Sequence, residues 1–177
     1  MSVGRYFRDK VRGAKIIHQG HSKFSGNVRK ALEDRWGQKV HVFTVLRDPI
    51  KHTQSLYSYM KHSRGHPKYA LGQRPFDEWA RNLNEFPYYV KFFGEGDTDA
   101  ALEVLSQFDT ILDTSSLSAD IREMLVSLGL KPKPMVHINR RPTITVGPDG
   151  RRLIRKLRQK DYDLLNKLDK RKHIKRS

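Results

Sequence analysis

A nearly continuous apolar stretch that ends at a charged turn and a proline constrains the fold of this chain more than any other segment. Residues 40–46 read Val-His-Val-Phe-Thr-Val-Leu, which is typical of a parallel strand buried on both faces. Arg47, Asp48 and Pro49 follow directly. Because proline suits the first position of a helix and the preceding aspartate can cap it, we predict a helix from Pro49 to about Lys61.

Helical and extended patterns alternate along the rest of the chain. They predict strands at residues 15–18, 108–112 and 135–138, and helices at 76–83, 100–105 and 118–128. Gly129 follows the last of these helices, where a helix C-terminus favours glycine, and the sequence Gly-Pro-Asp-Gly at 147–150 predicts a turn. The alternation predicts an α/β fold, a mainly parallel sheet flanked by helices, in one domain over residues 1–177.

The charge of the chain is large but uneven. It carries 35 Lys and Arg against 19 Asp and Glu, a formal net charge of +16, so a polyanionic partner is expected: nucleic acid, an anionic membrane surface, a sulfated glycan or a nucleotide. Residues 151–177 hold 12 Lys and Arg against three Asp, whereas residues 97–130 hold seven acidic residues against Arg122 alone. Because acidic and basic residues are segregated in this way, the chain is not a uniformly basic protein of the kind that coats nucleic acid.

Several classes of protein are excluded by what the sequence lacks. There is no cysteine, so disulfides, thiolate metal sites and a catalytic thiol are excluded, and no metal site is predicted. No apolar run approaches the roughly 20 residues of a membrane-spanning helix, and the first residues lack the apolar stretch of a signal peptide. The chain as written is therefore expected to be soluble. Neither zinc-finger spacing nor an aromatic RNA-binding strand motif is present.

Arg47 and Ser55 together predict an anion site. In open α/β sheets, ligands bind beyond the carboxyl ends of the strands, where a helix N-terminus favours phosphate. Arg47 can offer two parallel N–H donors there, and Ser55, about two turns into the helix, can add a hydroxyl from the same side. The alternative is that Arg47 pairs with a surface carboxylate and that Ser55 is a solvated helix position.

Residues 43–59, Phe-Thr-Val-Leu-Arg-Asp-Pro-Ile-Lys-His-Thr-Gln-Ser-Leu-Tyr-Ser-Tyr, resemble the 3′-phosphate-binding segment of sulfotransferases, particularly the heparan sulfate 2-O-sulfotransferase and Golgi carbohydrate sulfotransferase group. In that family the arginine of Arg-Asp-Pro and a serine eight residues later hold the 3′-phosphate of 3′-phosphoadenosine 5′-phosphosulfate. Arg47 and Ser55 match both positions, while His52 stands where the family often has arginine. The resemblance implies a P-loop-NTPase-like sulfotransferase fold and transfer of a sulfuryl group from this co-substrate to a hydroxyl of a carbohydrate acceptor.

Weaker likenesses extend over about residues 14–170. Gly20-His21 resembles the element whose histidine is the catalytic base in the 2-O-sulfotransferase branch, so His21 is the candidate base; a loop histidine bonded to backbone is the alternative. The family's 5′-phosphosulfate loop, Lys-Thr or Gly-x-Thr-Ser, has no counterpart before Ala14. The resemblance therefore predicts an N-terminally truncated form of the fold.

The terminal basic segment supplies further candidate residues. Its first part, residues 151–158, places apolar side chains on one face and predicts an amphipathic helix with a basic outer surface. The resemblance puts this region near the nucleotide, so the candidate cofactor-binding residues here are Arg151, Arg152 and Arg155. The alternatives are a packed helix with a solvated face, or a tail that contacts a polyanion.

Other residues of the chain have two interpretations each. Lys15, Lys23 and Arg29 could meet an anionic acceptor or be solvated surface charges. Trp36 and Trp79 are expected at or near the core rather than as sugar platforms. The alternative function is a catalytically impaired sulfotransferase-like protein that binds polyanions or nucleic acid.

Overall fold

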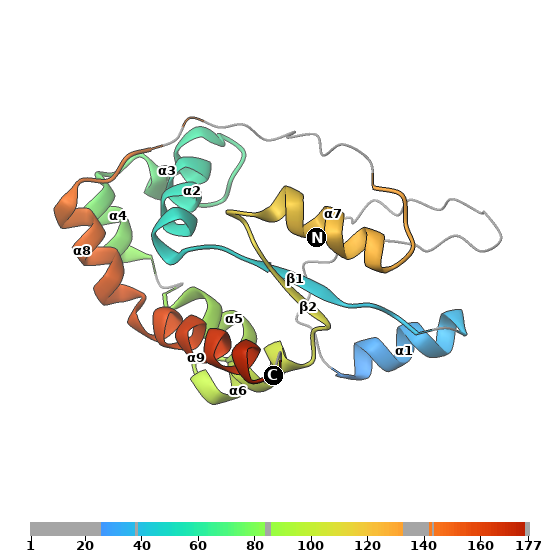
Figure 1. Cartoon of the computed structure of the whole chain (residues 1–177). Coiled ribbons are helices and arrows are strands. Elements are labelled where there is room, and N and C mark those ends of the chain that lie inside the picture. The colour runs from blue at the N-terminus through green and yellow to red at the C-terminus, as the bar shows by residue number, and fades with distance from the viewer. Residues whose placement is uncertain (1–25, 38, 84–85, 133–141, 143, 176–177) are drawn as a thin grey trace.

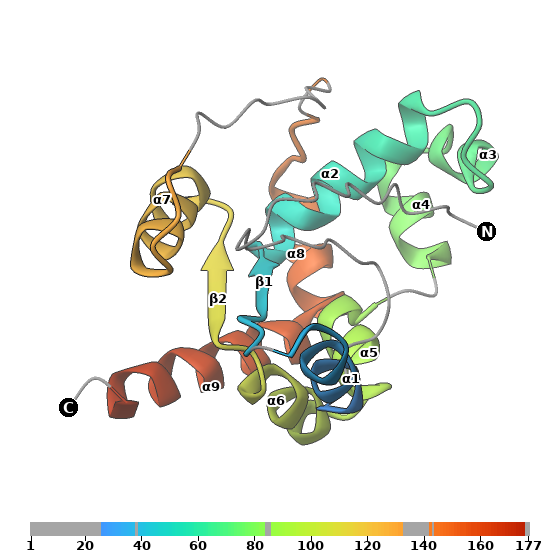
Figure 2. The same cartoon turned by 90° about the vertical axis from the view of Figure 1, so that its right-hand side faces the viewer.

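A small parallel sheet lies at the centre of the protein. The computed structural model describes residues 26–37, 39–83, 86–132, 142 and 144–175. Strands β1 (Phe43–Leu46) and β2 (Thr110–Asp113) pair in parallel with Phe43 opposite Thr110, and they run side by side in Figures 1 and 2. Helices flank this sheet, so the prediction of a parallel sheet between helices is confirmed, with two strands among the described residues. The strands predicted at 15–18 and 135–138 lie outside those residues.

Both strands begin later than predicted because a side chain replaces the strand ladder at their amino ends. The Val42 backbone N–H donates to a carboxylate oxygen of Asp109 at 2.7 Å, and the Asp109 N–H in turn donates to the Val42 carbonyl at 2.8 Å. Arg29, from helix α1 (Gly26–Trp36), forms an ion pair with the same carboxylate at 3.0 Å. These contacts fasten α1 to the amino edge of the sheet, the edge opposite to the predicted anion site.

Helix α2 (Pro49–His62) follows β1 after only two residues, as predicted. Asp48 is its N-cap, and a carboxylate oxygen of Asp48 accepts a hydrogen bond from the Lys51 N–H at 2.9 Å. Two short helices, α3 (Tyr69–Gly72) and α4 (Phe76–Asn82), come after it. A Cβ on Gly72 would lie 2.6 Å from the backbone of Met60, so α3 can approach α2 this closely only with glycine at that position.

Helices α5 (Tyr88–Gly94) and α6 (Thr98–Ser106) form a close pair joined by a tight turn. Glu95 and Gly96 have φ angles of 54° and 106°, which reverse the chain within a few residues. A Cβ on Gly94 would lie 2.5 Å from the Ala101 nitrogen. The approach of the two helices therefore depends on this glycine.

Helix α7 (Leu117–Ser127) ends as predicted at Gly129, which has a φ of 68°. The Leu130 N–H donates to the Leu125 carbonyl and the Gly129 N–H donates to the Val126 carbonyl, each at 2.8 Å. This pair of bonds is the Schellman arrangement that satisfies carbonyls at a helix C-terminus. In Figure 1, α7 lies on the opposite side of the sheet from α5, α6 and α9.

The predicted turn at residues 147–150 is wrong, because this sequence starts helix α8 (Pro148–Leu157). Gly147 is the N-cap and Pro148 occupies the first turn, which proline favours. Gly150 is buried, and a Cβ there would meet a methyl group of Val146 at 2.2 Å. The glycine thus serves close packing inside a helix. The basic segment continues as a separate helix, α9 (Gln159–Lys175).

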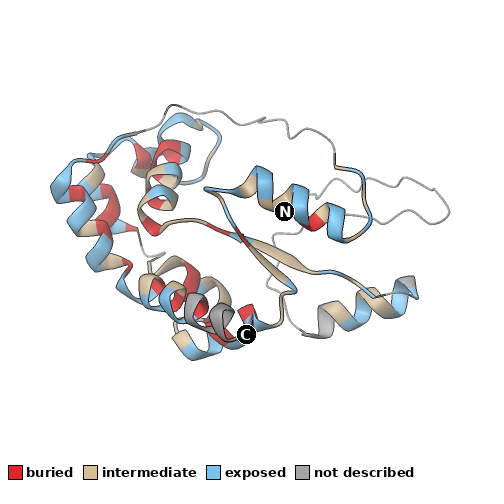
Figure 3. Cartoon of the chain, in the orientation of Figure 1, coloured by how far each residue is buried: buried red, intermediate tan, exposed pale blue. Residues whose placement is uncertain are grey.

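Two apolar clusters stabilise the described part of the protein, as the buried ribbon in Figure 3 illustrates. The first joins the sheet to three helices, through Leu46, Tyr89, Val90, Ala101, Leu102, Leu105, Leu164 and Leu168. The second joins α2 and α4, through Tyr57, Met60, Trp79, Ala80 and Leu83, and the α8 residues Leu153 and Leu157 pack against it. Trp79 is fully buried, which confirms its predicted place in the core. No helix of the described ranges is both long and apolar enough to cross a bilayer.

Candidate anion-binding site

The carboxyl ends of both strands open at the same edge of the sheet, beside the N-terminus of α2. The Thr114 N–H donates to the Leu46 carbonyl at 3.0 Å, so the chain leaving β2 stays against the end of β1. Arg47 is the next residue after Leu46, and α2 starts at Pro49. Its first N–H groups are unpaired within the helix and carry partial positive charge, so this is an edge that favours an anion.

The backbone of Arg47 is fixed by the hydroxyl of one tyrosine. Tyr89, on α5, accepts a hydrogen bond from the Arg47 N–H at 2.9 Å and donates one to the Arg47 carbonyl at 2.8 Å. Burial raises the pKa of Tyr89 to about 12, so the hydroxyl keeps the proton that it donates. Arg47 Nε is buried and has no hydrogen-bond partner in the described part of the chain. A buried guanidinium nitrogen without a partner is uncommon, and a bound anion would satisfy it.

Ser55, the second predicted ligand, is exposed on α2. It lies six residues after Pro49, about 9 Å along the helix axis, and its hydroxyl makes no hydrogen bond to a described residue. Lys51 is also exposed and lies one turn before Ser55, on the same side of the helix. The structure thus puts a serine hydroxyl and a lysine on the exposed side of the helix that follows Arg47.

His52 occupies the position between two arginines and is held neutral. Its Nδ1 lies 3.0 Å from Nη1 of Arg158, and its ring lies 4.4 Å from that of Tyr88. Burial, together with the positive charges of Arg158 and Arg47, lowers the pKa of His52 from 6.5 to about 3. His52 therefore accepts a hydrogen bond from Arg158 and does not add positive charge to the site.

Acid is expected to destabilise the fold through His52. Below pH 6.5 the unfolded chain binds a proton at this residue that the folded chain does not take up until about pH 3, so stability rises with pH across this window. The loss at pH 5 relative to pH 7 should be about 2 kcal/mol. Denaturant unfolding of parent and His52→Asn, which keeps a hydrogen-bond acceptor but cannot titrate, measures it. The control variant His62→Asn, which replaces an exposed histidine, should show the parent's dependence of the free energy of unfolding on pH. If His52→Asn also shows the parent's pH dependence, His52 is not the group responsible.

A buried ion pair between Arg158 and Asp161 holds this region together, and sequence reasoning missed it. Both side chains are fully buried, with 2.7 Å between Arg158 Nε and a carboxylate oxygen of Asp161. Asp161 also accepts hydrogen bonds from the backbone N–H groups of Tyr88 and Val90, at 2.8 and 3.0 Å, and so caps α5. No motif of the sequence assigned a role to either residue.

The remaining donors of Arg158 reach into the first turn of α2. Nη1 donates to the Pro49 carbonyl at 2.8 Å and to the Thr53 hydroxyl at 3.2 Å. Nη2 has no hydrogen-bond partner among the described residues, and the guanidinium lies 4.9 Å from the centre of the Tyr89 ring. A cation over a ring face is stabilised electrostatically, which offsets the missing hydrogen bond.

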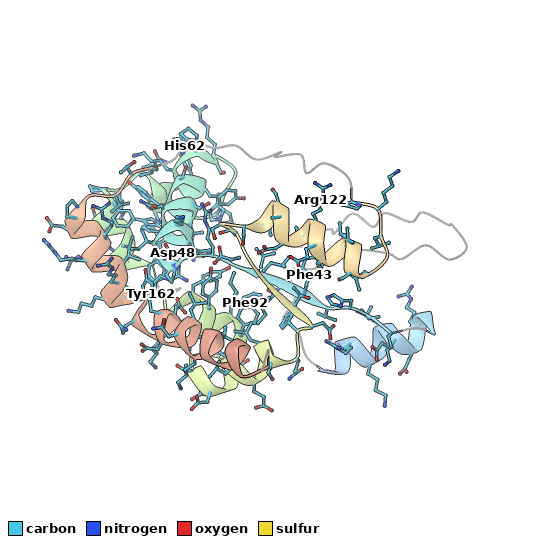
Figure 4. All side chains as sticks on the ribbon, in the orientation of Figure 1. Phe43, Asp48, His62, Phe92, Arg122 and Tyr162 are labelled. Carbon is cyan, nitrogen blue, oxygen red and sulfur yellow. The ribbon has the colours of Figure 1, made fainter. Side chains whose placement is uncertain are left out.

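The three arginines predicted on the basic helix do not share one environment. Arg151, Arg152 and Arg155 are all exposed on α8, and Arg152 pairs with Asp149. Arg155 is the one of the three that acts electrostatically on a residue near the site. Burial and the charge of Asp48 raise the pKa of Tyr162, and the charge of Arg155 lowers it. Figure 4 shows Asp48 and Tyr162 on neighbouring elements. The charge of Arg155 therefore acts on Tyr162, whereas Arg152 is paired with Asp149.

Tyr162 lies beside the first turn of α2. The Ile50 N–H partly lowers the pKa of Tyr162, although the two do not form a hydrogen bond of ordinary geometry, and the hydroxyl has no partner within the described ranges. The hydroxyl is thus a further polar group near the start of α2 that could bond to a ligand.

Other predicted residues fall outside the site or outside the described residues. His21, Lys15 and Lys23 lie outside the described ranges. Arg29 does not face an acceptor, because it is engaged by Asp109 and the Gln107 carbonyl. Burial alone would raise the pKa of Asp109, but the hydrogen bonds that it accepts from the Val42 N–H and from Arg29 lower it by more, so the pKa lies below its ordinary value. No group of side chains able to hold a metal ion occurs among the described residues.

Comparison of the chain with protein-family models, with curated proteins and with solved structures gives no match. What the site does must therefore be inferred from its own chemistry. That chemistry consists of a fixed arginine at a strand end, the N-terminus of a capped helix and an exposed hydroxyl on the same helix.

Proposed function

We propose that the protein is a sulfotransferase, with the edge formed by Arg47 and the N-terminal half of α2 as the site for the 3′-phosphate of 3′-phosphoadenosine 5′-phosphosulfate. The observation that carries the proposal is the state of Arg47: its backbone is fixed twice by Tyr89, and its Nε is buried without a partner. A guanidinium with an unsatisfied donor binds phosphate through charge-assisted hydrogen bonds. Ser55 adds its hydroxyl, in the order and spacing of the sulfotransferase motif.

The basic helix α8 supplies the next part of the proposed site. Arg155 is the one of the three predicted arginines proposed to contact the nucleotide, because its charge acts on Tyr162. Arg151 and Arg152 are proposed to contribute only to the positive field around it, since both are exposed on the same helix. We retain the P-loop-NTPase-like sulfotransferase fold as part of this proposal, with β1 and α2 as its 3′-phosphate-binding strand and helix.

The proposed reaction transfers a sulfuryl group to a carbohydrate hydroxyl. The acceptor oxygen attacks sulfur in line, the bond from sulfur to the bridging oxygen of the 5′-phosphate breaks, and 3′-phosphoadenosine 5′-phosphate leaves with the electron pair. A base takes the proton of the hydroxyl, and His21 is the proposed base because a free imidazole is partly neutral at physiological pH. No metal is required in this scheme.

Arg47→Ala should weaken the binding of 3′-phosphoadenosine 5′-phosphate by about 10- to 150-fold, because one charge-assisted contact contributes about 1.5–3 kcal/mol. Titration calorimetry on parent and variant measures the change directly. Arg81→Ala, which removes an exposed arginine from α4, is the matched control and should bind like the parent. Equal affinity in parent and Arg47→Ala would remove the site from consideration.

The second candidate is a protein that binds polyanions without transferring sulfate. It is favoured by the net charge of +16 and by the exposed arginines of α8. Competition separates the two functions. If heparin binds and 3′-phosphoadenosine 5′-phosphate neither binds nor competes, the polyanion-binding function replaces the enzyme.

A further inference from the structure

The Tyr89 hydroxyl stands where the backbone of a neighbouring strand would stand in a larger sheet. In a parallel sheet, the N–H and carbonyl groups of alternate residues point to one neighbouring strand, and those of the residues between them point the other way. The Thr114 N–H bonds the Leu46 carbonyl, so Leu46 points toward β2, and the backbone groups of Arg47, the next residue, point away from β2. Tyr89 bonds both of these groups, at 2.9 and 2.8 Å. A single side-chain oxygen thus ends the sheet at the residue where the anion site begins.

A buried ion pair holds Tyr89 in this place. Asp161 accepts hydrogen bonds from the backbone N–H groups of the two residues that flank Tyr89, at 2.8 and 3.0 Å. The guanidinium of Arg158, the partner of Asp161, lies 4.9 Å from the centre of the Tyr89 ring and donates to the Pro49 carbonyl at 2.8 Å. The pair therefore ties the first turn of α5, which carries Tyr89, to the first turn of α2, which follows Arg47.

We propose that Tyr89 is the positioning residue of the anion site and holds Arg47 where its guanidinium binds the anion; that this anion is a 3′-phosphate rests on the proposed function. Without the hydroxyl, the Arg47 N–H and carbonyl lose the partner that they share. Unpaired backbone groups are costly inside a protein, so the chain at Arg47 must shift to bring them to water. That shift carries the guanidinium away from the phosphate. A ligand without a 3′-phosphate makes no contact with Arg47 in the proposed site and is not affected.

Tyr89→Phe should weaken the binding of 3′-phosphoadenosine 5′-phosphate by about 3- to 30-fold, within the range of coupling between members of one hydrogen-bond network. The affinity for adenosine 5′-phosphate, which lacks only the 3′-phosphate, should be unchanged. In an Arg47→Ala background, Tyr89→Phe should change neither affinity, because no guanidinium is left to position. Titration calorimetry measures these affinities. A purely structural role would lower the affinity for both nucleotides alike.

Tyr57→Phe is the matched control for the loss of a buried tyrosine hydroxyl. Tyr57 and Tyr89 are 3% and 4% exposed, and the Tyr57 hydroxyl also bonds a backbone carbonyl, that of Arg74 at 2.7 Å. Tyr57 belongs to the second apolar cluster, whereas Tyr89 belongs to the first. The control variant should bind both nucleotides as the parent does. Denaturant unfolding of the two variants shows whether their losses of stability are similar.

The side chain of Arg47 can also be observed without a ligand. Its Nε is buried, so the attached proton should exchange slowly with water and give a nitrogen resonance, which Arg47→Ala assigns by removing it. In the parent and in Tyr57→Phe, the heteronuclear Overhauser effect at this nitrogen should match that of the β1 backbone. In Tyr89→Phe it should fall toward the value of an exposed arginine such as Arg81.

The outcomes separate this inference from the proposed function. A loss of affinity confined to the nucleotide with the 3′-phosphate, together with a mobile Arg47 side chain, supports the positioning role. Parent-like affinities in Tyr89→Phe, or equal losses for the two nucleotides, would overturn that role while the nucleotide site stands. If the parent binds neither nucleotide, the proposed function fails and the Arg47 resonance decides: a lower Overhauser effect in Tyr89→Phe supports the positioning of Arg47, and an unchanged one overturns it.

Discussion

Replacing Asp161 with asparagine should lower the free energy of unfolding by about 3–5 kcal/mol, because it leaves the Arg158 guanidinium buried without its counter-ion. Asparagine keeps the shape of the side chain but has only one oxygen, whereas Asp161 accepts the N–H groups of Tyr88 and Val90 through separate oxygens, so the loss combines the missing charge with one lost hydrogen bond. Denaturant unfolding followed by circular dichroism measures it. Such a loss is a large fraction of the roughly 5–15 kcal/mol by which folded domains are stable.

Asp163→Asn is the matched control for this prediction. Asp163 is an exposed aspartate two residues further along α9, bonded to Gln159, and its replacement should change the free energy of unfolding by less than about 0.5 kcal/mol. The double variant Arg158→Met/Asp161→Asn removes both charges and should lose less than the sum of the two single variants. Strictly additive losses would mean that the pair is not coupled.

His21→Ala should reduce the turnover of sulfate transfer by about 100- to 10,000-fold, the usual contribution of a positioned general base, while the affinity for nucleotide stays nearly unchanged. The separation of the two effects distinguishes a base from a residue that binds the co-substrate. Turnover is measured with 3′-phosphoadenosine 5′-phosphosulfate and a carbohydrate acceptor, on these 177 residues and on any longer form of the chain.

A second histidine controls for nonspecific loss in that assay. His41→Ala removes an exposed histidine at the amino edge of the sheet, where its ring bonds the Thr110 hydroxyl, and should leave turnover unchanged. If His21→Ala transfers sulfate as fast as the parent, His21 is not the base, although Arg47 could still bind the nucleotide. If a parent that binds the nucleotide transfers nothing in any form of the chain, the binding function is favoured over the enzyme.

The parts of the fold that sequence could predict are those where a local signal and the tertiary packing agree. The Asp48-Pro49 start of α2 and the Gly129 end of α7 are examples, since each residue satisfies backbone groups of its own helix. The sequence of residues 147–150 has the composition of a turn, but Pro148 also suits a first helical turn and Gly150 packs closely against Val146. Only packing could distinguish those two possibilities.

The residues of the candidate site also fall into those that a local sequence signal indicates and those that only the tertiary structure reveals. Arg47 and Ser55 could be found because strand end, proline and helix are adjacent in sequence, and the motif marks both residues. Tyr89 and Arg158 could not, because they reach the site from 42 and 109 residues away, through contacts with Arg47 and Pro49 respectively. An arginine in a basic segment is expected to be solvated, so nothing in the sequence distinguishes the buried Arg158 from its exposed neighbours.

The two hydrogen bonds between Tyr89 and the backbone of Arg47 have a consequence for ligand recognition. They hold the peptide groups on both sides of the Arg47 Cα, so the direction in which its side chain leaves the backbone is set during folding. An anion that arrives at the strand end then meets an arginine whose backbone is already ordered and need not immobilise a loop, which lowers the entropic cost of association.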